Sequence, residues 1–149
     1  MTEYLLDIWV PGRPVPQGSL SRNRAGVTYQ KKSLVDWRNL INQAAADYTG
    51  TWFGEWAPLD EPVEVIGRFY LPRPKSATRV HPTVSPDVDK LARGLLDALA
   101  PKRNRKIADG SFLADDSRVI RLDVTKTYAH GLPGDGEVPG VRVKVRKYE

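Results

Sequence analysis

The stretch from Ser85 to Ala100 constrains the fold more than any other part of the chain. Pro86 restricts Ser85 to an extended conformation and is typical of a helix entrance. Apolar residues then recur at helical spacing, namely Val88, Leu91, Ala92, Leu95, Leu96 and Leu99. The pattern predicts a helix that begins near Asp87, packs one face on a core and meets solvent at its first turn.

Two aspartates stand at the predicted start of this helix. Residues two positions apart on a helix differ by about 200° around its axis, so Asp87 and Asp89 can converge only if one precedes the helix. We expect Asp87 at or just before the N-cap and Asp89 in the first turn. Arg93, one turn later, could pair with Asp89 or reach a phosphate. Acidic residues also favour helix starts for electrostatic reasons alone, so a plain helix cap stays open.

A second acidic pair, Asp115 and Asp116, directly precedes an alternating stretch over 119–127 that predicts a half-buried strand. Both acidic pairs therefore fall at the ends of predicted elements, where functional groups usually gather. The chain has no cysteine and two histidines, which excludes thiolate sites and a three-histidine zinc site within one chain. Any metal is expected to have oxygen ligands, and His81 is assigned no catalytic role.

Positive charge is concentrated in three segments, whereas the net charge of +5 is by itself a modest attraction for polyanions. The segment 11–32 has no acidic residue, 73–81 leads into the aspartate helix, and 101–110 follows it. Such loops can follow a phosphate backbone, although solvated basic loops are equally common. The DNA-binding candidates are Arg13, Arg22, Arg24, Lys31, Lys32, Arg73, Lys75, Arg79, Lys102, Arg103, Arg105 and Lys106.

The remaining patterns predict strands over 4–10, 62–71 and 141–146 and a helix over 34–48, which Ser33 caps and Gly50 ends. The last strand is expected at a sheet edge because its polar face is basic. Trp52, Phe53 and Trp56 form an aromatic cluster expected in a core or interface. The order β-α-β-α-β-β predicts one α+β domain over 1–149, a mixed sheet with helices packed on one side.

No apolar run approaches the ~20 residues of a membrane span, and the N-terminus lacks the basic-then-apolar pattern of a signal peptide. We therefore expect a soluble, cytoplasmic protein.

From His81 to Lys126 the sequence resembles the RusA family of Holliday junction resolvases, dimeric endonucleases of bacteria, prophages and phages. That family has a basic stretch, Pro-Asp-Leu-Asp-Asn-Leu, a helix ending Leu-Asp-Ala-Leu, a variable loop, and Asp-Asp-Ser/Ala-Gln-Val before a strand with a lysine. The matching residues here are Pro86 to Leu91, Leu96 to Leu99, Asp115 to Val119, and Lys126. The order and spacing of these parts are more specific than any one of them.

The resemblance implies a role for each matching position. Asp87, Asp89 and Asp116 would be the catalytic aspartates, and Arg93 would take the place of a catalytically important lysine. Lys90 replaces the usual asparagine and could supply the ammonium group instead. Asp115 is expected to support the catalytic aspartates, and Lys126 joins the DNA-binding candidates. A RusA-like fold, a homodimer and a branched DNA substrate are also implied.

Three clustered carboxylates would repel one another unless a cation joined them, so Mg²⁺ is the expected cofactor, with Mn²⁺ able to substitute. The function expected is a metal-dependent endodeoxyribonuclease that resolves Holliday junctions or other branched DNA in recombination and repair. Two alternatives remain open from the residues: a non-catalytic basic DNA-binding module, and a metal-dependent hydrolase of small phosphate esters.

Overall fold

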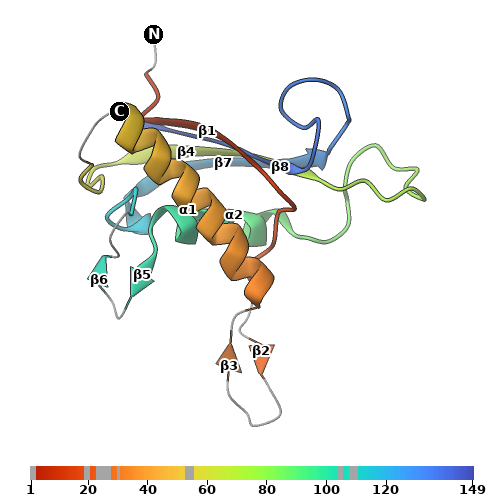
Figure 1. Cartoon of the computed structure of the whole chain (residues 1–149), viewed down its shortest axis with the longest axis horizontal. Coiled ribbons are helices and arrows are strands. Elements are labelled where there is room, and N and C mark those ends of the chain that lie inside the picture. The colour runs from red at the N-terminus through yellow and green to blue at the C-terminus, as the bar shows by residue number, and fades with distance from the viewer. Residues whose placement is uncertain are drawn as a thin grey trace.

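Figure 1 shows the computed structural model of the chain, which describes residues 3–18, 21–22, 28–29, 31–52, 56–103, 106–107 and 111–149. Two helices and four longer strands form the body, and two short hairpins extend from it. In chain order the elements are β1 (Leu6–Pro11), β2 (Ser21–Arg22), β3 (Thr28–Tyr29), α1 (Lys32–Trp52), β4 (Val63–Leu71), α2 (Val88–Leu99), β5 (Lys102–Arg103), β6 (Lys106–Ile107), the 3₁₀ turn η1 (Asp116–Arg118), β7 (Val119–Tyr128) and β8 (Gly140–Lys147).

The sheet confirms the predicted mixed α+β architecture. Its strand order is β1-β8-β4-β7, with β8 antiparallel to both neighbours and β7 parallel to β4. Both helices lie on one side of it, and the β2–β3 and β5–β6 hairpins extend away from the sheet on that side (Figure 1). The body therefore has the predicted order β-α-β-α-β-β, a helix layer on a sheet.

The core lies between the helix layer and the sheet. Alternate residues of the strands face it, including Val65 and Phe69 of β4, and α2 contributes Leu91, Leu95 and Leu99. Gly67 sits directly beneath α2: a Cβ built there would be 2.9 Å from Leu95 Cδ2. The missing side chain lets α2 approach the sheet closely.

Because β7 runs parallel to β4, the chain between them must cross from one end of the sheet to the other. The helix α2 makes this crossing, so its first residue lies beyond the end of β4. The start of α2 therefore lies near the C-terminal end of β7, where Tyr128 is opposite Leu71 of β4.

Two sequence expectations are wrong. The last strand is not at an edge, since β8 pairs with both β1 and β4. Its basic residues Arg142 and Arg146 instead face the side of the sheet without helices, where they pair with Asp7 and Glu64. A charged face reports exposure of one face of a strand, and it says nothing about the strand's edges.

The limits of the first helix also differ from those expected. It begins at Lys32, so Ser33 is inside it, and it continues past Gly50 to Trp52. Glycine weakens a helix interior by only about 1 kcal/mol relative to alanine, which buried neighbours such as Thr49 can offset. Phe53 lies outside the described residues, and Trp56 stacks on Phe112 with ring centroids 5.0 Å apart, as expected for a packing role.

None of the helices in the described ranges combines the length and apolar character needed to cross a membrane.

Candidate active site at the entrance of α2

The two aspartates occupy the positions expected at the start of α2. Asp87 is the N-cap residue with an extended backbone, and Asp89 lies in the first turn. The carboxylate of Asp87 makes no capping hydrogen bond, and both aspartate side chains are exposed. The Asp87 carboxylate is therefore not used to cap α2, although Asp87 is the N-cap residue.

The first two turns of α2 also carry two cationic residues. Lys90 Nζ is 3.4 Å from Asp87 Oδ2, an ion pair across one helical turn. Arg93 is exposed, and within the described part of the chain it forms no ion pair with Asp89 or with any other carboxylate. The pairing with Asp89 that its spacing allowed is therefore not formed.

Asp115 and Asp116 lie in and before η1, which packs against α2. The Asp115 carboxylate accepts a hydrogen bond from Ser117 N at 3.1 Å and so caps this turn. The segment entering η1 is fixed to the far end of α2, because the N–H groups of Phe112 and Leu113 both donate to Leu99 O at 2.9 Å. Among the described residues no three acidic or histidine side chains form a group that could hold a metal ion.

Lys126 reaches from β7 to the loop that enters α2. Its Nζ donates to Val84 O and Pro86 O, each at 2.8 Å. Pro86 directly precedes Asp87, so the ammonium group fixes the last residues before the catalytic candidates. Two of the three N–H groups of this expected DNA contact are therefore used within the protein.

A cavity of about 580 Å³ adjoins the same loop. Arg13, Pro86 and Tyr128 are among its lining residues, so the first basic segment and the α2 entrance lie side by side. Arg79 donates to Tyr128 Oη at 3.2 Å, and the Arg73 guanidinium lies 5.4 Å from the centre of the Tyr128 ring. Basic residues from two expected segments thus lie at this cavity or contact Tyr128 in its wall.

Three polar residues to which the sequence assigned no role hold the first basic segment on the helices. Gln17 is buried, donates to Asp97 Oδ2, and accepts from Arg38 Nη1 at 3.1 Å. Its backbone N–H also donates to Lys90 O at 3.0 Å. The three residues are far apart in the sequence, so no local pattern could have connected them.

The family model of the endodeoxyribonuclease RusA matches residues 11–146 of the 149-residue chain. The chain belongs to the RusA family. No curated protein matches it significantly. The RusA match reaches well beyond 81–126, where the motif residues stand, and includes the first basic segment and β8.

Membership of the RusA family implies an endodeoxyribonuclease that acts on Holliday junctions. The DNA-binding candidates of this RusA chain divide by their surroundings. Lys32 is tied to Asp36 at 2.8 Å, and this hydrogen bond raises the pKa of the lysine, whereas Lys31 and Lys75 are exposed. Arg22, Lys102, Arg103 and Lys106 lie in the short hairpins. Arg24 and Arg105 lie outside the described residues.

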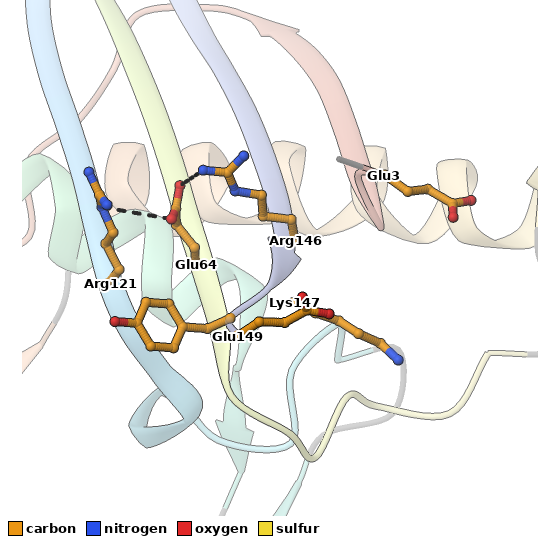
Figure 2. A pocket seen from close by; sticks show the side chains of 7 residues that line it. Glu3, Glu64, Arg121, Arg146, Lys147 and Glu149 are labelled. Carbon is orange, nitrogen blue, oxygen red and sulfur yellow. Dashed lines mark ion pairs between the residues drawn. The ribbon is translucent and has the colours of Figure 1, made fainter. Parts of the chain in front are cut away.

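A second cavity, of about 590 Å³, lies on the sheet face without helices. Figure 2 shows Glu64 between Arg121 and Arg146, with the helices behind the strands. The Glu64 side chain is only 7% exposed, and Arg146 Nη2 lies 2.9 Å from its Oε1. Acidic and basic residues both line this cavity, so it lacks the uniform positive charge that would attract the DNA substrate of a RusA enzyme.

Proposed function

We propose that this RusA-family protein is a magnesium-dependent endodeoxyribonuclease that cleaves four-way junctions or other branched DNA in recombination and repair. The observation that carries the proposal is the exposed Asp87 carboxylate at the N-cap of α2, which makes no capping hydrogen bond and stands near Asp89 and a cavity lined by Arg13. A metal-dependent nuclease holds its divalent cation between such carboxylates and a phosphate of the substrate.

The donor set suits Mg²⁺ in its chemistry. This ion prefers oxygen ligands and is commonly held by one or two carboxylates, with waters and substrate phosphates completing its shell. Asp87 and Asp89 at the start of α2 would supply two carboxylates. Asp116 of η1 is the third candidate, but η1 follows the segment bonded to Leu99 O at the opposite end of α2, so among the described residues of one chain Asp116 does not join the other two. When bound, the ion would activate water and stabilise the leaving oxygen, and Mn²⁺ should substitute.

The protein's own residues would position the DNA. Arg93 would contact a phosphate and offset the negative charge that develops during cleavage, and Lys90 would balance Asp87. Arg13, which lines the cavity beside the α2 entrance, and Arg79, which donates to Tyr128 Oη in its wall, would hold the flanking DNA backbone.

Single substitutions at the aspartates test the proposal on a synthetic four-way junction with Mg²⁺. We expect Asp87→Asn and Asp89→Asn to reduce cleavage by about 100-fold or more while binding is retained, since each removes a carboxylate that holds the ion. Asp36→Asn, an exposed change on α1, is the matched control and should cleave normally. Normal cleavage by Asp89→Asn would remove the proposed site.

The two alternative functions predict different results in the same assay. A non-catalytic module would bind the junction with or without a chelator and never nick it. A hydrolase of small phosphate esters would turn over nucleotides and show little salt dependence toward DNA. Cleavage that needs Mg²⁺, together with binding that weakens steeply with salt, would exclude both.

We further propose that the protein acts as a homodimer in the bacterial cytoplasm, whether its gene is bacterial or phage-borne. Two-fold symmetry would present two active sites to the paired strands of a branched junction. The family match to a junction endonuclease supports this arrangement.

A further inference from the structure

Gln17 is a buried polar residue in a segment without regular secondary structure. It is only 7% exposed, and burying an amide is unfavourable unless its hydrogen bonds are satisfied. Both ends of the amide are satisfied here. Its Nε2 donates to Asp97 Oδ2 of α2, and its Oε1 accepts from Arg38 Nη1 of α1 at 3.1 Å. The two helices thus hold one side chain of the first basic segment between them.

Arg38 and Asp97 also contact each other, which completes the cluster. Arg38 Nη1 lies 3.7 Å from Asp97 Oδ2, and both side chains are partly buried. Because Asp97 and Arg38 are charged, their hydrogen bonds to the Gln17 amide are stronger than bonds between neutral groups. Asp97 belongs to the Leu-Asp-Ala-Leu part of the family pattern, and neither the metal site nor the DNA contacts proposed above use it.

The backbone of the same segment is fixed at both of its ends. At one end, Gln17 N donates to Lys90 O in the first turn of α2 at 3.0 Å. At the other end the segment continues β1, and Gly12 N donates to Pro139 O at 2.9 Å. The segment 13–17 therefore spans from the sheet to α2 and is bonded to each of them.

Between these ends the segment has little freedom to bend. Its sequence is Arg-Pro-Val-Pro-Gln, and each proline fixes its own φ and restricts the residue before it to extended conformations. Arg13 is exposed and lines the cavity beside the α2 entrance, whereas Gln17 at the other end is buried. Because the segment is stiff, the fixed position of Gln17 determines where Arg13 lies.

We propose that Gln17 is a positioning residue for DNA binding, and that Asp97 and Arg38 act through it. Together they hold the segment 13–17 so that the Arg13 guanidinium is already at the cavity when DNA arrives, which reduces the conformational entropy lost on binding a phosphate. This inference rests on the proposed function and deepens it. It assigns Asp97 of the family pattern to the placement of a DNA contact and not to metal binding.

Removal of the Gln17 side chain should have the same effect as removal of the Arg13 charge. For a labelled four-way junction in chelator, we expect Gln17→Ala to make the slope of log affinity against log salt concentration less negative by about 0.9, the value of one phosphate contact. Arg13→Gln should add little in the Gln17→Ala background, although it has its full effect in the wild type. Without DNA, Gln17→Ala should also lower the backbone ¹⁵N order parameters of Arg13 and Val15.

Exchange of the two partners tests the contact between Gln17 and Asp97 itself. Gln17→Glu would place two carboxylates together, so we expect junction affinity to fall about fivefold or more. Adding Asp97→Asn restores the net charge and lets the new amide donate to the new carboxylate, so the double variant should recover wild-type affinity within about twofold. Gln43→Glu is the matched control: this exposed glutamine of α1 also donates to an aspartate, Asp47, at 2.8 Å, and its substitution should leave affinity unchanged.

Additive effects of Arg13→Gln and Gln17→Ala on the salt slope would overturn the proposal, because the two residues would then act independently. Unchanged order parameters in Gln17→Ala would also overturn it. The exchange variants keep the sizes of both side chains, so a double variant without recovery would overturn the proposal even if circular dichroism shows that Gln17→Ala is unstable. All binding is measured in chelator, so this coupling can be present in a protein that never cleaves DNA, and a Mg²⁺-dependent nuclease can lack it.

Discussion

At the scale of single residues, Lys126 shows how a side chain far along the chain can organise the entrance of α2. Its ammonium group donates to Val84 O and Pro86 O, both at 2.8 Å, just before Asp87. Hydrogen bonds from charged groups contribute about 1.5–3 kcal/mol each, enough to favour one arrangement of a surface loop. Lys126 is therefore better explained as a positioning residue than as a free DNA contact.

Removing this ammonium group should loosen the loop while the core stays intact. We expect Lys126→Met to lower the backbone ¹⁵N order parameters of Ser85, Asp87 and Asp89 and to reduce cleavage, with a melting temperature close to wild type. Lys75→Met, an exposed lysine with no such contacts among the described residues, serves as the control. Unchanged order parameters in Lys126→Met would show that the loop is ordered without the hydrogen bonds from this ammonium group.

The ion pair between Arg68 and Asp123 gives a pH-dependent prediction. Arg68 Nη1 donates to Asp123 Oδ1 at 2.8 Å and Nη2 to Oδ2 at 3.0 Å, and these bonds lower the pKa of the Asp123 carboxyl below its usual value. A lowered folded-state pKa adds stability above the unfolded pKa of about 3.9, and that stability is lost as the pH falls through the folded value.

Arg68→Gln should remove this stabilisation. We expect the Asp123 pKa, measured by ¹³C NMR of the carboxyl carbon, to rise toward its usual value. The loss of unfolding free energy should be at most about 1 kcal/mol near pH 7, because the pair is partly exposed, and should vanish in strong acid. A loss that persists unchanged at pH 2 would mean that Arg68 stabilises the sheet by packing alone.

At the scale of elements, the closeness of α2 to the sheet fixes where its first turn lies. The absence of a side chain at Gly67 allows Leu95 to pack directly on β4. A Cβ at position 67 would require the Leu95 side chain to move, so the packing of α2 on β4 at this point would change. The close packing of α2 on the sheet thus depends on a contact at the middle of the helix.

Gly67→Ala should destabilise the protein by about 1–3 kcal/mol in urea unfolding, as overpacked cores do, since the new Cβ would lie 2.9 Å from Leu95 Cδ2. Gly50→Ala makes the same chemical change inside α1, where nothing lies within 4 Å of the new Cβ. That variant should be stabilised by about 0.5–1 kcal/mol through helix propensity. Equal effects at the two positions would contradict the close approach of α2.

At the scale of the whole molecule, the basic residues divide into those available to DNA and those already neutralised. Arg13 lines the cavity beside α2 and is exposed, whereas Lys32 is tied to Asp36 within α1. The net charge cannot distinguish these two kinds of residue, because each contributes one positive charge to it. Their contributions to DNA affinity should differ.

Salt titrations of junction binding can measure the difference. Each phosphate contact contributes about −0.9 to the slope of log affinity against log salt concentration. We expect Arg13→Gln to make the slope less negative by about that amount, and Lys32→Gln to change it little. An unchanged slope in Arg13→Gln would place the DNA away from the cavity.

The sequence alone determined the local elements and the family-specific spacing around α2. Helical and alternating patterns depend on neighbouring residues, so the start of α2 at Asp87, the burial of one face of β4 and the order β-α-β-α-β-β were all predicted correctly. Gly50 was misjudged because the packing of its neighbours outweighed its weak local preference.

Only the tertiary structure decided which strands are neighbours and which charges are already used. The place of β8 between β1 and β4, the parallel pairing of β7 with β4, and the bonds of Lys126 and Gln17 all join residues that are distant in the chain. Such contacts are selected by the packing of a whole helix layer on a sheet. No local pattern records that choice, because the partner of each residue is fixed only when the elements assemble.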